Sequence, residues 1–360
     1  MLTILDKYII KKFLGAYFMS IILIISIAVV FDFSEKLDDF IENDAPAKAI
    51  AFDYYLNFIP YYTNLFSALF VFISCIFFTS KLASNSEIIA MLAGGVSFRR
   101  IMRPYLISAI FIGLLNFVLG GFIIPKSNKI RLDFEDQYIK KIYRDYSSNI
   151  QLKVSKNDIV YIDRYQMSSN QGSNFSLDHF EGKKLVSRIT AGYITYDTLD
   201  QWTVRNYMIR EFEGLNEKLT NGTGKTMTMT INMTPSDFYI VQGESQLMNT
   251  IELKRYLNKQ KKRGIANIKE FELQYYRHFA NPFAAIILTI IALCLSSKKV
   301  RGGMGLNLGI GLMLSFSYIM FDSVSSTLTI NGGFPSVISI WVPNFIFIII
   351  AFIIYQKSPK

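Results

Sequence analysis

The sequence predicts an α-helical polytopic membrane protein with six transmembrane helices and an inserted all-β domain. Six stretches carry no charged residue, and each is about as long as the ~20 residues that a bilayer-spanning helix needs. They are Phe13–Phe31, Tyr54–Ser80, Pro104–Pro125, Phe279–Ser297, Gly302–Phe321 and a last stretch ending near Tyr355. About 150 residues of ordinary soluble sequence separate the third stretch from the fourth. The chain therefore combines a helical membrane part with one water-facing insert.

The charges indicate how these helices are oriented. A net charge of +10 would favour nucleic-acid binding in a soluble protein, but the basic residues gather at one set of span ends. The opposite short segment, 32–53, holds seven acidic residues. The positive-inside rule then places both termini and the loops at 81–103 and 298–301 in the cytoplasm, and the insert outside it. The basicity is a topology signal, and no nucleic-acid partner is predicted.

Several chemistries are excluded by the sequence. The basic start before Phe13 resembles a signal peptide, but the apolar run is too long and no cleavage site follows, so an uncleaved first span is expected. Cys75 and Cys294 lie inside spans, and His179 and His278 have no companions at ligand spacing. We therefore expect no disulfide in the insert, no metal and no cofactor.

The segment 222–226 resembles the end of a phosphate-binding loop. That loop needs a glycine where the chain has Leu219, and it needs a helix next, whereas an alternating strand pattern follows. We expect a turn between strands and no nucleotide binding by the chain itself. The six runs also contain no ionisable residue of the kind that ion-coupled transporters keep near the midplane. Energy for any transport must then come from a partner, and no enzymatic activity is expected of this chain.

The insert begins and ends with helices and is β-rich between them. Residues 126–144 continue the third span as a polar helix, and a helix is expected again from Thr250 through 254–263, with a capping box from Asn267 to Glu270. Period-two patterns between these helices predict an antiparallel sandwich, jelly roll or open barrel with strands at 159–162, 175–177, 189–196, 202–209 and 226–234. Met227, Met229, Ile231 and Met233 share one face of the last strand. The expected domains are 1–125, 126–276 (a jelly-roll-like β domain with helical connectors) and 277–360.

The loop at 81–103 holds a short helix, expected over 84–95. Ser84 and Glu87 have capping-box spacing, the side chains Ile88, Met91 and Leu92 form an apolar face, and a Gly94-Gly95 pair ends the helix. One interpretation is a surface helix lying on the membrane. The other is a coupling helix that docks into a groove on a partner ATPase.

At these residues the chain resembles the lipopolysaccharide-export permeases of the LptF/LptG family. The resemblance is spread over most of the chain and rests on the order of its blocks. These are Leu5-Asp6-Lys7-Tyr8-Ile9, Ser86-Glu87-Ile88-Ile89-Ala90-Met91 with Ala93-Gly94-Gly95-Val96-Ser97, Met248-Asn-Thr-Ile-Glu-Leu253, Arg277-His-Phe-Ala-Asn-Pro-Phe283 and Trp341-Val-Pro-Asn344.

The resemblance implies a function and a set of partners. The chain would be a permease of an ABC transporter in the bacterial inner membrane, paired with a paralogous permease and a cytoplasmic ATPase dimer. It would extract lipopolysaccharide from among membrane lipids and pass it through a periplasmic jelly-roll domain to bridge proteins of the same type.

The resemblance also assigns residues. Coupling to the ATPase would involve Glu87, Ile88, Met91, Arg99 and Arg100, and the four-residue face of Met227, Met229, Ile231 and Met233 would line the lipid conduit. Spans one and five would form a lateral gate with Phe31, Lys36, Asn307 and Phe316 on the substrate path. The segment after span one is acidic at Asp38-Asp39, where the family often has basic residues, so recognition of lipid phosphates there is in question.

Two alternatives remain open at this stage. One is an ABC permease for another lipid or a lipoprotein, since no headgroup pocket is readable in the sequence. The other is a membrane-anchored periplasmic binding or scaffold protein that transports nothing, although six spans exceed what an anchor requires.

Overall fold

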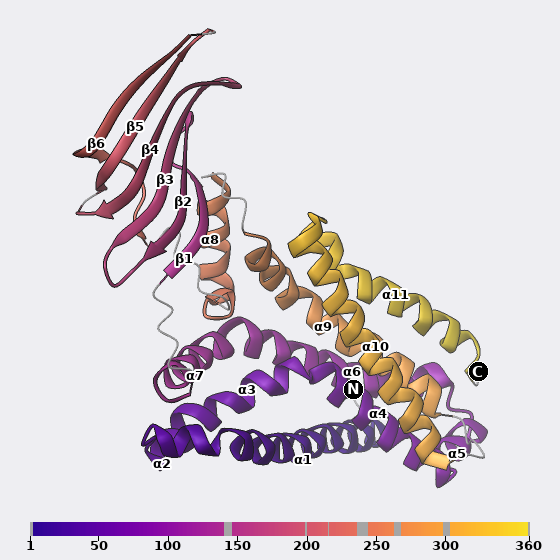
Figure 1. The fold of residues 1–360 in the computed structure, drawn as a ribbon. Coiled ribbons are helices and arrows are strands. Elements are labelled where there is room, and N and C mark those ends of the chain that lie inside the picture. The colour runs from indigo at the N-terminus through magenta and orange to yellow at the C-terminus, as the bar shows by residue number, and fades with distance from the viewer. Residues whose placement is uncertain are drawn as a thin grey trace. The chain divides into compact units, whose positions relative to one another are not determined.

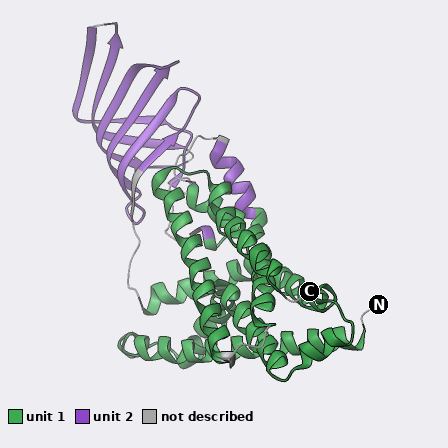
Figure 2. Ribbon diagram, turned by 90° about the vertical axis from the view of Figure 1, so that its right-hand side faces the viewer, with its two compact units in different colours: residues 1–141, 246–251, 269–360 green, residues 142–245, 252–268 purple. Residues whose placement is uncertain are grey.

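The structure is a computed structural model that describes residues 3–139, 146–198, 200–214, 216–235, 244–262, 268–297 and 303–358. The predicted loop cations Lys298, Lys299 and Arg301 and the predicted cap Asn267 lie outside these ranges. The chain forms two compact units (Figure 2). The first combines residues 1–141, 246–251 and 269–360, and the second combines 142–245 and 252–268.

The first unit contains the six predicted spans. Six helices are long and apolar enough to cross a membrane, three before the insert and three after it (Figure 1). They are α1 (Ile4–Glu42), α4 (Ser67–Ser84), the continuous segment Phe98–Tyr138, α9 (Lys269–Ser296), α10 (Gly303–Gly332) and α11 (Ser336–Gln356). The third consists of α6 (Phe98–Val118), a π-helical turn η2 (Leu119–Ile123) and α7 (Ile124–Tyr138), so the predicted polar continuation of span three is confirmed up to Tyr138.

Burial differs sharply among the spans. The most apolar 18-residue window of α4 is 72% buried inside the chain, but the corresponding windows of α1 and α10 are only 17% buried. Both α1 and α10 pack against α4. The outer faces of α1 and α10 are therefore large apolar surfaces that face lipid or another subunit.

The predicted span Tyr54–Ser80 is wrong at its first half. The short α2 (Ala47–Ala49) and η1 (Ile50–Tyr55) precede the run, which starts in the last two residues of η1 and is then divided into α3 (Leu56–Leu65) and α4. Phe66 leaves the helical region, with φ −97° and ψ 12°, and separates α3 from α4. A charge-free run carries no signal for such a bend, because uncharged residues continue on both sides of it.

The second unit is built on one antiparallel sheet, which confirms the inserted all-β domain. Its strands are β1 (Tyr146–Lys153), β2 (Asp158–Gln166), β3 (Gln171–Glu181), β4 (Lys184–Tyr196), β5 (Gln201–Glu213) and β6 (Asn216–Thr230). Each strand pairs with the next in the chain, so the described residues form an up-and-down meander, which Figure 1 shows as a curved sheet. The helix α8 (Thr250–Lys262) follows, as expected from the sequence.

The alternation of buried side chains changes phase in the middle of the sheet. Ladder pairing skips Asn174 and Asn206, both of which have positive φ, 52° and 57°. On β2, Ile162 and Tyr165 are both fully buried although they are three residues apart. The break in strand pairing at Asn174 and Asn206 thus shifts the alternation by one residue, and apolar side chains stay buried both before and after it.

The predicted turn at 222–226 is also wrong, because this segment lies inside β6. The β5–β6 register shifts here, between Arg205 and Tyr207, and Gly224 has a φ of 74° and donates its N–H to Oδ1 of Asn206 at 2.9 Å. A Cβ on Gly222 would stand 2.4 Å from the ring of Tyr207. Gly222 and Gly224 accommodate a β-bulge beneath the ring of Tyr207. A glycine-rich bulge and a glycine-rich turn have the same sequence pattern, which explains the wrong prediction.

Candidate functional site

The short helix of the 81–103 loop exists, as α5 (Glu87–Ala93), but its predicted capping box does not. Ser86 precedes the helix in the left-handed region, with φ 61°, and no side chain caps the first turn. The hydroxyl of Ser84 instead donates to the carbonyl of Lys81 at 2.9 Å. The predicted end of the helix at Gly94 is correct, and Gly95 follows with a φ of 83°.

The apolar side of α5 faces the chain's own membrane unit. Ile88 is 1% exposed and belongs to the main core, with Met91 packed against that core. Ile89 is 50% exposed and lies on the outer side. Ile88 and Met91 therefore attach the helix, and the free surface near Ile89 is what a partner could contact.

Glu87 is held at the start of α5 by two neighbours. Its Oε2 accepts a hydrogen bond from the hydroxyl of Tyr8 on α1 at 3.4 Å, and its Oε1 accepts from the amide of Asn85 at 3.3 Å. The carboxylate is thus connected to α1, a link between residues 79 positions apart in sequence.

Arg99 and Arg100 connect α6 to two other spans. Nε of Arg99 donates to the hydroxyl of Tyr355 on α11 at 3.1 Å. Arg100 forms an ion pair with Asp6 on α1 at 2.6 Å. The five predicted coupling residues thus lie where α1, α5, α6 and α11 are joined.

Lys36 is paired within the chain. Its Nζ lies 2.6 Å from Oδ1 of Asp32 and also contacts the hydroxyl of Tyr54. The hydroxyls of Tyr54 and Tyr55 donate to Oδ2 of Asp32 at 3.0 and 3.2 Å. Burial raises the pKa of Tyr54, and the negative charge of Asp32 raises it further, so the phenol remains a hydrogen-bond donor. Asp32 balances the charge of Lys36, which does not act as an isolated cation.

The remaining gate residues are divided between surface and interior. Phe31 on α1 is 72% exposed and Phe316 on α10 is 57% exposed. Asn307 is buried, and its amide donates to the hydroxyl of Ser80 on α4 at 3.2 Å. Asn307 joins two helices, which is the commoner use of a polar residue inside a membrane.

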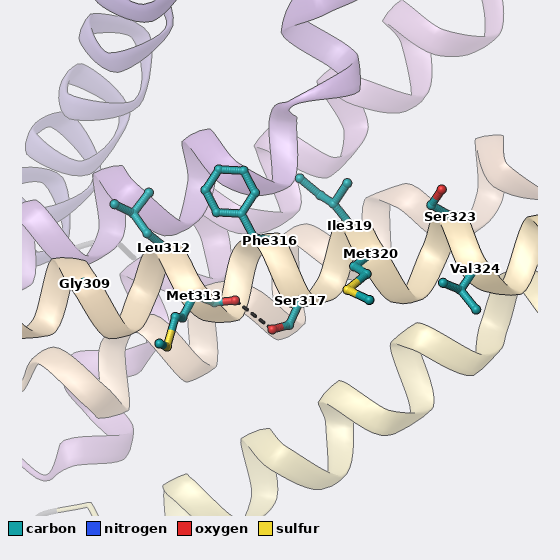
Figure 3. A pocket seen from close by; sticks show the side chains of 9 residues that line it. All are labelled: Gly309, Leu312, Met313, Phe316, Ser317, Ile319, Met320, Ser323 and Val324. Carbon is teal, nitrogen blue, oxygen red and sulfur yellow. Dashed lines mark hydrogen bonds between the residues drawn. The ribbon is translucent and has the colours of Figure 1, made fainter.

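An apolar groove runs along the exposed side of α10. Its lining residues extend from Gly309 to Val324 and all belong to α10, so the groove is open on its outer side. Figure 3 shows Leu312, Phe316 and Ile319 along one side of the helix and Met313 and Met320 along the other. Close packing of α10 occurs at Gly311, where a Cβ would stand 2.1 Å from Ile76 on α4, whereas Gly305 and Gly309 face open space.

One ion pair near this groove was missed by sequence reasoning. Arg277 on α9 and Asp322 on α10 lie just outside the predicted charge-free runs, but both fall inside the observed helices. Nη2 of Arg277 is 3.1 Å from Oδ2 of Asp322 and donates to Ser326 at 2.9 Å. The sequence could have indicated this pair. Consecutive spans are antiparallel, so Arg277 at the start of span four and Asp322 at the end of span five lie at the same level of the membrane.

The predicted conduit face has two parts. Met227 and Met229 lie on β6, half-buried, and pair in register with the fully buried Val204 and Trp202. Ile231 and Met233 follow the end of β6 and are 3% and 1% exposed. The first two side chains border the sheet surface, and the last two are core.

Comparison with known proteins agrees with this architecture. The chain is 21% identical to the lipopolysaccharide export system permease protein LptG of Escherichia coli strain K12, over 99% of each chain. It is 19% identical to the protein of the same name from Haemophilus influenzae, over 97% of each chain. The family model described as lipopolysaccharide export system permease LptF/LptG matches residues 7–357. A match of this extent covers all six spans and the inserted sheet, and the chain therefore belongs to the LptF/LptG family of lipopolysaccharide export system permeases.

Proposed function

We propose that the chain is a transmembrane permease subunit that extracts lipopolysaccharide from the inner membrane and passes it toward the outer membrane. The observation that carries this proposal is the family match over residues 7–357 of a chain with six candidate spans and a β insert. The protein is a multi-pass protein of the inner membrane. Both termini lie in the cytoplasm and the β unit in the periplasm, in keeping with the basic residues at one set of span ends.

A partner ATPase dimer supplies the energy and docks at α5. Two features support this assignment. The outer side of α5, with Ile89 half-exposed, is available, and the helix is attached through buried Ile88 and through Tyr8 to α1. The ion pair between Asp6 and Arg100 and the bond from Arg99 to Tyr355 extend the attachment to α6 and α11. Movement at α5 is therefore transmitted to three spans.

The lipid moves along the exposed faces of α1 and α10. These faces are apolar, and Phe31 and Phe316 lie on them. A paralogous permease contributes the opposite wall of the gate. The lipid then passes the Met227 and Met229 face of the sheet to periplasmic bridge proteins of jelly-roll type.

Reconstitution tests the proposal. The chain is co-expressed with its paralogue and the ATPase, placed in vesicles containing lipopolysaccharide, and supplied with ATP and a soluble acceptor of the bridge type. We expect release of lipopolysaccharide to the acceptor only with ATP and with both permeases present. Release of a different lipid or a lipoprotein, or purification of the chain with a soluble partner and no ATPase, would contradict the proposal.

A further inference from the structure

A pocket with many polar groups lies inside the membrane unit among α3, α4, α6, α7, α9 and α10. Its volume is about 390 Å³, which is in the range of small-ligand sites. Its polar lining combines hydroxyl groups and the pair of Arg277 with Asp322 with six side-chain amides: Asn64, Asn116, Asn128, Gln246, Gln274 and Asn281. Such a lining is costly in a bundle of apolar helices unless it has something to bind.

Several of these groups are buried without a partner. Within the part of the chain that the structure describes, no hydrogen-bond partner is found for Oδ1 of Asn64, Oδ1 of Asn116, either side-chain atom of Asn128, or Nε of Arg277. Asn128 is 0% exposed and Asn116 is 5% exposed. An unsatisfied buried polar group costs about 1–3 kcal/mol, and native structures rarely leave several together. The cluster therefore points to a ligand that completes these hydrogen bonds.

The charge balance of the pocket selects the kind of ligand. Its cation, Arg277, is paired with Asp322, so the described lining has no excess positive charge. Phosphate groups are usually bound by an excess of cationic donors. Amides offer both donors and acceptors, which matches hydroxyl groups that each donate and accept. The lining therefore suits an uncharged, hydroxyl-rich group.

The pocket is continuous with the apolar groove of α10. Ile319 and Ser323 line both of them, and Figure 3 shows these two residues following Phe316 along the helix. Leu65 and Ile330, which also line the pocket, are 51% and 50% exposed apolar residues. A polar pocket joined to an apolar groove fits an amphiphile, with its head among the amides and its chain along α10.

We infer that this site binds the uncharged sugar of a glycolipid, with an acyl chain in the α10 groove. Asn64, Asn116 and Asn128 supply the hydrogen bonds to the sugar hydroxyls, and the pair of Arg277 with Asp322 keeps the pocket neutral. The inference rests on the proposed function only in that lipopolysaccharide is itself a glycolipid.

Photochemical capture tests the site in the full chain. The protein is placed in phosphatidylcholine nanodiscs with a dodecyl glucoside that carries a diazirine in its alkyl chain. We expect crosslinks on α10 between residues 312 and 324. Unlabelled dodecyl glucoside should suppress them at a concentration at least tenfold lower than dodecylphosphocholine, which has the same chain and a zwitterionic phosphate-containing head.

A matched pair of variants separates binding from folding. Asn128→Leu removes amide atoms that have no described partner, so it should raise the melting temperature and reduce capture at least tenfold. Asn43 lies outside the pocket, and its amide donates to the carbonyls of Asp39 and Tyr138 at 2.8 and 2.9 Å. Asn43→Leu should lower the melting temperature and leave capture unchanged.

Three results would overturn the inference. They are equal competition by dodecylphosphocholine, unchanged capture by Asn128→Leu, and a lowered melting temperature of Asn128→Leu, which would show that the amide is satisfied within the protein. The test needs neither ATPase nor lipopolysaccharide. If the protein captures the glucoside but releases no lipopolysaccharide, the site is supported and the proposed function is contradicted. If it releases lipopolysaccharide but captures no glucoside, the function is supported and the site is contradicted.

Discussion

Arg100 forms a bidentate ion pair with Asp6: Nη1 donates to Oδ1 at 2.6 Å and Nη2 donates to Oδ2 at 2.7 Å. The carboxylate is almost fully buried, with its side chain 4% exposed. Its Oδ2 also accepts the backbone N–H of Thr3 at 2.8 Å, as part of a capping box that begins α1. One carboxylate thus caps the first span and fixes it to the third.

Removing the charge of Asp6 should destabilise the membrane unit. Asp6→Asn leaves the guanidinium without a carboxylate, and we expect a loss of about 1–3 kcal/mol, because a hydrogen bond to a charged group is lost in a partly buried site. Arg100→Lys keeps the charge but cannot form the bidentate pair of hydrogen bonds. Its melting temperature in detergent should therefore lie between those of the wild type and Asp6→Asn. Lys12→Gln, at an exposed position of the same helix, serves as the control. Equal melting temperatures for Asp6→Asn and the control would contradict the assigned role of the pair.

Glu87 should act on the partner ATPase through its charge. Glu87→Gln keeps one acceptor oxygen for Asn85, and its NH2 group can donate to the hydroxyl oxygen of Tyr8, so the fold and the amount in the membrane should persist. A charge-assisted contact to a basic residue of the ATPase would be lost, at about 1.5–3 kcal/mol. We expect ATP-driven lipopolysaccharide release to fall at least tenfold in reconstituted vesicles.

Tyr8→Phe provides the matched control for Glu87. It removes the 3.4 Å contact within the chain and leaves the carboxylate charged. Release by Tyr8→Phe should fall much less than release by Glu87→Gln, because buried Ile88 still attaches α5 to the membrane unit. If Tyr8→Phe loses as much release as Glu87→Gln, Glu87 acts inside the chain and its contact with the ATPase is refuted.

Among Gly305, Gly309, Gly311 and Gly332 of α10, Gly311 should be the one at which an alanine destabilises the protein. The Cβ of an alanine there would stand 2.1 Å from Cδ1 of Ile76, whereas at Gly309 it would meet nothing within 4 Å. Because Ile76 is fully buried, Gly311→Ala should cost about 1–3 kcal/mol by overpacking. Gly309→Ala should be neutral or slightly stabilising, since alanine favours a helix.

Thermal melting of a double variant checks the cause. Ile76→Val removes the Cδ1 atom that would clash, so Ile76→Val with Gly311→Ala should melt higher than Gly311→Ala alone. A double variant that melts lower than both single variants would show that the contact between α4 and α10 is not limited by this atom.

The sequence predicted those parts of the structure that depend on composition and periodicity. Charge-free runs located six spans, and alternation located five of the six strands of the sheet. The bend at Phe66 was missed because the span was delimited by charge alone, and no charged residue marks the bend, although the segment before it, with Pro60 and Asn64, is more polar than α4. At α5, the spacing of Ser84 and Glu87 predicted a capping box, but a left-handed Ser86 separates the two residues. Local spacing cannot show this, because contacts of Ile88 with the distant core fix the position of the helix.

The candidate site depends still more on distant contacts. The basic side chain of Lys36 was apparent in the sequence, but its pairing with Asp32 and Tyr54 depends on how η1 returns to α1. The amide pocket joins residues of six α-helices, and each asparagine by itself is typical of a helix–helix contact. Only the three-dimensional arrangement shows that some of these amide atoms have no hydrogen-bond partner among the described residues.

Met229 should contact lipid during transport, and Met233 should not. Both belong to the same alternating face in the sequence, but Met229 is half-buried on β6 whereas Met233 is 1% exposed and accepts a hydrogen bond from Trp202 on its carbonyl at 3.1 Å. Flexible thioether side chains suit a surface that adapts to variable acyl chains. A photo-crosslinking residue at 229 should therefore capture lipopolysaccharide only while ATP is hydrolysed, and the same residue at 233 should capture only protein. Capture at neither position, with capture at Phe31 in the same vesicles, would show that this face is core and that the lipid leaves the membrane by another route.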